Sequence, residues 1–111
     1  MEKIFKISEP FQVNQKIVLT GVVLSEKIEV GDSFLYRTSQ GNYKESSVLE
    51  IEKFRESWLT KVFKDKNVGL VIKGGEKSEF NDEVILYKGG SIDELKVFLE
   101  IQENKFSEKK Q

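Results

Sequence analysis

The chain has 111 residues, which suits a single domain, because a chain of this size buries roughly 65% of its unfolded surface around one core. It contains no cysteine and no histidine, so disulfides, thiolate nucleophiles, histidine bases and the common zinc ligand sets are excluded. Eighteen Lys and Arg residues against 19 Asp and Glu residues give a formal charge of −1, so any binding to nucleic acid or to an anionic membrane needs a local basic patch.

Residues 1–90 carry short apolar runs rich in β-branched and aromatic residues, separated by Gly, Asn, Asp or Ser. This pattern is typical of consecutive strands. The apolar residues are continuous in two of the runs, Ile17-Val18-Leu19 and Val68-Gly69-Leu70-Val71-Ile72, which indicates strands that are covered on both faces or that lie centrally in the sheet. Seven short strands predict an all-β domain with a closed or sandwiched sheet. They are expected at residues 4–7, 11–13, 17–24, 32–37, 47–54, 67–73 and 84–87.

The pattern changes after Gly90. Ser91 is followed three residues later by Glu94, which is the signature of a capping box at the start of a helix. One face of that helix would carry Ile92, Leu95, Phe98 and Leu99. We therefore expect a β domain over residues 1–90, a helix over 91–103 packed on it, and a polar, frayed tail over 104–111.

No run reaches the roughly 20 apolar residues that cross a bilayer, and Met1-Glu2-Lys3 leads into a strand-like run rather than a signal peptide. The expected location is the cytoplasm, with no membrane partner. The initiator-like Met1 and the polar end Lys109-Lys110-Gln111 predict a complete small protein.

Two blocks of sequence carry a family resemblance. The first is Leu19-Thr20-Gly21-Val22-Val23-Leu24, followed by Lys27-Ile28-Glu29-Val30-Gly31-Asp32. The second begins with Val48-Leu49-Glu50-Ile51-Glu52-Lys53-Phe54-Arg55, resumes after residues 56–66 with Asn67-Val68-Gly69-Leu70-Val71-Ile72-Lys73-Gly74, and ends in Val84-Ile85-Leu86-Tyr87-Lys88. In order and spacing, over about residues 11–90, these blocks resemble domain 2 of translational GTPases such as elongation factor Tu. The resemblance implies a small antiparallel, Greek-key-like β-barrel, here with one C-terminal helix.

The resemblance also implies a binding site. In elongation factor Tu, domain 2 holds the aminoacylated 3′ end of tRNA, and the matching positions of this chain are Glu52, Arg55 and Asn67. Such side chains can contact a base, a phosphate and a ribose. The expected RNA partner is tRNA or ribosomal RNA. The chain has no Gly-x-x-x-x-Gly-Lys-Ser/Thr loop, so we expect no bound nucleotide, no GTP hydrolysis and no cofactor.

A basic cluster surrounds residues 56–66 and is interleaved with Trp58 and Phe63. Basic residues mixed with aromatic residues indicate nucleic-acid binding. In a second interpretation Trp58 and Phe63 anchor a protein partner, and in a third they pack on the barrel inside a rim of solvated lysines. The basic residues are Lys53, Arg55, Lys61, Lys64, Lys66 and Lys73.

Three segments depart from the family pattern: Asn14-Gln15-Lys16, Val22, and Asn81-Asp82-Glu83, whose carboxylates would repel phosphate. Carboxylates also occur together at Glu50 and Glu52, which raises acid–base catalysis as an alternative. Residues two apart on a strand share a face, so solvent exposure explains that pair equally well. We therefore expect a non-enzymatic binding module without a metal, which contacts an RNA end or the ribosome, or else a protein partner.

Overall fold

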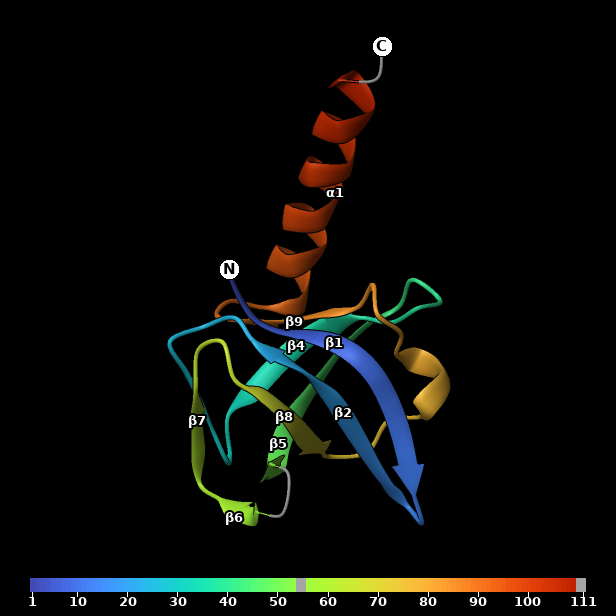
Figure 1. The fold of residues 1–111 in the computed structure, drawn as a ribbon. Helices are drawn as coiled ribbons and strands as arrows, with labels where there is room; N and C mark the ends of the chain where they lie inside the picture. Colours follow the sequence, from blue (N-terminus) through green and yellow to red (C-terminus); the bar gives the residue numbers. More distant parts are fainter. Residues whose placement is uncertain (54–55, 110–111) are drawn as a thin grey trace.

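A computed structural model describes the backbone of residues 1–53 and 56–109 and the side chains of residues 1–53 and 59–104. This part of the chain forms strands, one short 3-10 helix and one α-helix (Figure 1). The strands are β1 (Glu2–Val13), β2 (Lys16–Val23), β3 (Lys27–Glu29), β4 (Ser33–Arg37), β5 (Tyr43–Lys53), β6 (Glu56–Leu59), β7 (Lys61–Phe63), β8 (Asn67–Ile72) and β9 (Ile85–Lys88). The helices are η1 (Lys77–Glu79) and α1 (Ile92–Lys109).

The main sheet closes on itself. Its strands follow the order β4-β9-β1-β2-β8-β5, and β5 pairs back with β4, so six antiparallel strands form a barrel (Figure 1). β6 extends one end of β5 as a short hairpin arm. The predicted antiparallel β-barrel with one C-terminal helix is confirmed.

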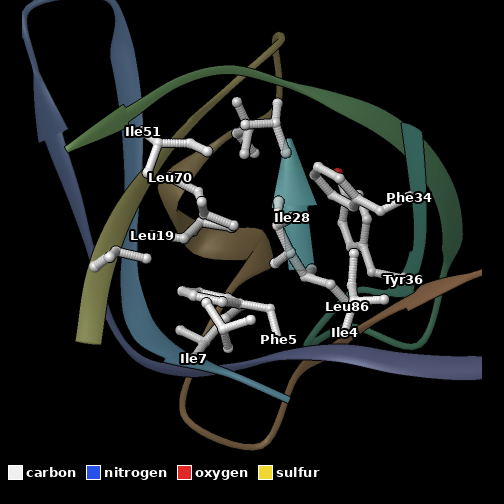
Figure 2. Close-up of a cluster of buried hydrophobic side chains, with 14 of the residues drawn as sticks. Ile4, Phe5, Ile7, Leu19, Ile28, Phe34, Tyr36, Ile51, Leu70 and Leu86 are labelled. Atoms are coloured by element: carbon white, nitrogen blue, oxygen red, sulfur yellow. The ribbon is translucent and has the colours of Figure 1, made fainter. Parts of the chain in front are cut away.

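The barrel interior is filled by apolar side chains from all six strands. Figure 2 shows Phe5, Leu19, Leu70 and Ile51 converging on the barrel axis, and each is fully buried. Ile28 joins them from outside the main sheet, because β3 and β7 form a separate two-stranded sheet across one end of the barrel. This small sheet closes that end of the core.

A close crossing of two strands explains one glycine. A Cβ atom on Gly21 in β2 would lie 2.0 Å from the carbonyl oxygen of Lys6 in β1, so no side chain fits there. A glycine inside a strand often marks such a close approach of two backbones.

α1 begins where the sequence predicts. The Ser91 hydroxyl accepts a hydrogen bond from the Glu94 backbone N–H at 3.2 Å, as an N-cap does. Leu95 and Leu99 are buried against Leu35 and Tyr87 on the outside of the barrel. The helix continues to Lys109, beyond the expected end at residue 103, and its second half projects away from the barrel (Figure 1). No helix within residues 1–53 and 56–109 is long and apolar enough to cross a membrane.

Candidate functional site

A groove lies on the outer face of the barrel, over β2, β8 and β5. The register pairs Thr20 with Gly69 and Gly69 with Glu52, so these three positions form one row across the three strands. Because the middle position has no side chain, the row is hollow at its centre. The groove has a volume of about 500 Å³ and is lined by Val18 and Thr20 from β2, Asn67 and Gly69 from β8, and Glu52 and Lys53 from β5.

The floor of the groove is apolar and its rim is polar. Val18 is buried beside Gly69, and a Cβ atom on Gly69 would lie 3.1 Å from its Cγ1 atom. Thr20 donates its hydroxyl to the backbone oxygen of Glu9 at 2.8 Å, which fixes the orientation of the hydroxyl. Glu52 is half-buried, while Lys53 and Asn67 are exposed. The groove therefore offers a flat apolar surface bordered by an acid, an amide and an ammonium group.

The structure brings together some of the residues expected from the sequence. Glu52, Lys53 and Asn67 line the groove. Lys64 and Lys66 are exposed in the turn that leads into Asn67, and that turn is held to the end of β2 by a hydrogen bond from Val23 N–H to the Lys66 oxygen at 3.1 Å.

Other expected residues lie elsewhere. Lys73 follows the opposite end of β8, six residues from Asn67, or about 20 Å along an extended chain. Phe63 is 51% exposed on β7, with the Lys61 ammonium 5.9 Å from its ring centroid, so Phe63 does not pack on the barrel. Arg55 lies outside the described residues, and so does the side chain of Trp58.

Residue-based reasoning missed Val18 and the role of Gly69 as the floor. Val18 stands in a predicted apolar run and Gly69 in the second family-like block, but their position beside each other on the outer face follows only from the pairing of β2 with β8. The carboxylates of Asp82 and Glu83 were expected to repel RNA from the site. Glu83 instead lines a second hollow of about 740 Å³ between α1 and the β4–β5 turn, and neither residue lines the groove.

The second hollow is larger than the groove, but an ion pair bridges it and its lining carries charges of both signs. Arg37 donates to the Glu103 carboxylate at 2.5 Å across it, and this hydrogen bond raises the pKa of the guanidinium. Lys96 and Glu100 add one charge of each sign. Among the residues with described side chains, none of those expected to bind a ligand lines this hollow. In the part of the chain with described side chains, no three Asp or Glu residues are grouped to hold a metal ion.

Comparison with known proteins supports the barrel fold. No family model matches the sequence, and no curated protein matches it. Among solved structures, the chain is similar to translation elongation factor SelB from Methanococcus maripaludis in its apo form, with a TM-score of 0.65 and 21% identity. The barrel has the fold of a translation-factor domain. The alignment covers 78% of this chain but only 18% of that factor, so the chain corresponds to a small part of its length. The predicted resemblance to the domain-2 barrel is confirmed for the fold.

Proposed function

We propose that this protein is a non-enzymatic binding module whose groove over β2, β8 and β5 takes the single-stranded 3′ end of an RNA. One observation carries the proposal. Glu52, Lys53 and Asn67, which the sequence indicates from two separate segments, border one groove of about 500 Å³, a size typical of small-ligand pockets.

The groove suits a terminal nucleoside. A base ring can lie over Gly69 and Val18, because this floor is apolar and has no side chain at its centre. The Glu52 carboxylate can accept hydrogen bonds from an exocyclic amino group or a ribose hydroxyl, and the Asn67 amide can both donate and accept. Lys53 lines the groove, and Lys64 and Lys66 are exposed in the turn that leads into Asn67. The phosphates that precede the terminal nucleoside would lie at this end.

The test is a titration of isotope-labelled protein with a CCA oligonucleotide, followed by NMR. We expect micromolar or weaker affinity, with shifts concentrated at Glu52, Asn67 and Gly69. Replacing Asn67 with Ala, or Arg55 with Ala, should weaken binding about tenfold, as loss of one specific polar contact does. A protein that shows no shifts at low salt, or shifts spread evenly over its lysines, would contradict a built RNA site.

A protein partner is the second candidate, and one observation favours it. Phe63 holds a large aromatic ring half in solvent, on a small sheet whose other face is anchored in the core by Ile28 and Val62. Rigid exposed aromatic side chains are frequent anchors at protein interfaces. Capture of partners from a native lysate with and without RNase separates the candidates, because a protein partner held through Phe63 survives RNase and is lost in Phe63→Ala.

A further inference from the structure

An exposed aromatic ring lies one turn away from the groove. The turn of residues 64–66 leads from the end of β7 into β8, so it joins Phe63 to Asn67 at the end of the groove (Figure 1). Phe63 is 51% exposed, and the Lys61 ammonium lies 5.9 Å from its ring centroid. The Cα atoms of Phe63 and Asn67 are at most about 14 Å apart, because four residues of extended chain span no more. A single strand of a few nucleotides that leaves the groove at Asn67 can therefore reach this ring.

The backbone of this turn is held in place. The Lys64 N–H donates to the Glu26 oxygen at 3.1 Å, and the Asp65 N–H donates to the Val23 oxygen at 2.9 Å. The Val23 N–H donates in return to the Lys66 oxygen at 3.1 Å. β7 itself pairs with β3 across the end of the barrel. The ring and the turn therefore keep one position relative to the groove, which lowers the entropy cost of binding one ligand to both.

The charges around the turn favour a polyanion. Residues 61–66 contain three lysines and one acid, Asp65, in a chain whose formal charge is −1. Lys61, Lys64 and Lys66 are exposed, and no ion pair joins any of them to a carboxylate among the described side chains. Even with Glu26, whose backbone oxygen binds the turn, the balance of charge stays positive. Proteins that bind single strands combine such cations, which follow the phosphates, with aromatic rings on which bases stack.

We propose that the RNA site extends from the groove to Phe63, where the ring stacks a base upstream of the terminal nucleoside. The phosphates between the two bases would pass Lys66 and Lys64, and the phosphate beside the stacked base would meet Lys61. This extension rests on the proposed function, because the groove sets where the strand ends. Its ligand is a single strand of several nucleotides, and the ring accepts any base because it contacts only the base's aromatic face.

The length of the RNA tests the extension. The ligands are the CCA trinucleotide, the hexanucleotide AAACCA, and a hexanucleotide whose first three positions keep their phosphates but lack their bases. In NMR titrations at low salt, all three should shift Glu52, Asn67 and Gly69. Only AAACCA should shift the aromatic ring signals of Phe63. AAACCA should also bind about tenfold more tightly than its abasic form, which is the gain from one stacked base.

Substitutions at Phe63 separate stacking from charge. Phe63→Ala should remove the tenfold gain and leave the affinity for CCA unchanged, whereas Phe63→Trp should keep the gain, because an indole ring also stacks on a base. Ile101→Ala is the matched control and should change none of these affinities. Ile101 is similarly exposed, at 49%, but lies on α1, whose second half projects away from the barrel (Figure 1).

Failure of the groove and failure of the extension give different results. The absence of shifts at Glu52, Asn67 and Gly69 with every ligand would contradict the groove site itself. Groove shifts with CCA but equal affinity for the two hexanucleotides would overturn only the extension, and so would an equal loss for CCA and AAACCA in Phe63→Ala. A Phe63→Ala variant that binds AAACCA like wild type but loses an RNase-resistant partner would also overturn it and assign Phe63 to protein binding.

Discussion

Two strand glycines show how a single missing side chain can serve either stability or binding. A Cβ atom at Gly21 would meet the Lys6 carbonyl oxygen at 2.0 Å, which only a backbone movement can relieve. At Gly69 the nearest atom is Val18 Cγ1 at 3.1 Å, a side-chain atom that can shift by a few tenths of an ångström. The first glycine is required by the barrel, and the second keeps the groove open.

Alanine at these two positions should therefore give opposite results. We expect Gly21→Ala to lower the free energy of unfolding by about 1 to 3 kcal/mol or more, as overpacking against backbone does. Gly69→Ala should change stability by less than about 1 kcal/mol but weaken binding of a CCA oligonucleotide, because the methyl group occupies the floor. Urea unfolding and the NMR titration measure the two effects. Equal loss of stability in both variants would contradict the assignment of Gly69 to the groove.

Glu79 is a buried carboxylate outside the groove. It accepts hydrogen bonds from the Lys44 ammonium, from the Glu76 backbone N–H at 3.0 Å and from the Tyr36 hydroxyl at 3.4 Å. Burial raises its pKa, but these hydrogen bonds and the charge of Lys44 outweigh burial and hold the pKa below its ordinary value of 4.5. Its ionised form therefore ties η1 to the core residue Tyr36.

The lowered pKa makes stability depend on pH. The contribution of Glu79 is fully present above the pKa of the unfolded chain, near 4.5, and is lost as the pH falls through the lower pKa of the folded state. Glu79→Gln should cost about 1 to 3 kcal/mol at neutral pH, and the difference from wild type should shrink in acid. Urea unfolding at a series of pH values measures both. A constant difference between the two proteins down to the lowest pH would contradict this role.

At the level of elements, long apolar runs could be predicted and short strands could not. β2 and β8 were expected from their continuous apolar residues. β3, β6 and β7 have three or four residues each, too few to show a period, so the sequence pattern does not predict them. β1 was predicted as two strands, at residues 4–7 and 11–13, with Pro10 between them. Pro10 is tolerated there because β9 pairs only with Glu2–Lys6, so this part of β1 is an edge that needs no donor from residue 10.

The side chains on one side of the first turns of α1 should hold this helix on the barrel. Leu95 is fully buried against Leu35 and Tyr87, so Leu95→Ala should lower the free energy of unfolding by about 2 to 5 kcal/mol. Val97→Ala is the matched control, because it removes apolar carbon from the exposed side of the same helix and should change stability by less than about 0.5 kcal/mol. Urea unfolding measures both changes. A similar cost in both variants would mean that α1 is not docked through Leu95.

For the whole molecule, the closed barrel and part of the groove could be predicted from the sequence. Which residues lie together in the groove depends on the register of the paired strands. Glu52 and Asn67 were found through family resemblance, whereas Val18, Thr20 and Gly69 join them only because β2, β8 and β5 are neighbours. The expected basic cluster is divided for the same reason. Lys64 and Lys66 lie at the Asn67 end of β8, and Lys73 lies at the other end.

This division predicts how RNA binding responds to salt. The chain carries a formal charge of −1, so attraction for phosphate must come from lysines close to the groove rather than from the molecule as a whole. Each phosphate contact to a single strand contributes a slope of about 0.7 in the logarithm of affinity against the logarithm of salt concentration. Three such contacts, from Lys53, Lys64 and Lys66, should give a slope near 2. Stacking of one base should add about 1 to 3 kcal/mol to the binding free energy, independently of salt.

Lys66→Ala and Lys73→Ala make a matched pair, since each removes one positive charge from an exposed position at an end of β8. Lys66→Ala should lower the slope by about 0.7 and weaken binding at low salt, because it removes a phosphate contact. Lys73→Ala should leave the slope unchanged, because residue 73 is about 20 Å of extended chain away from Asn67. Titrations of a CCA oligonucleotide at several salt concentrations measure both slopes. Equal changes in the two variants would mean that diffuse charge, and not the groove, attracts the RNA.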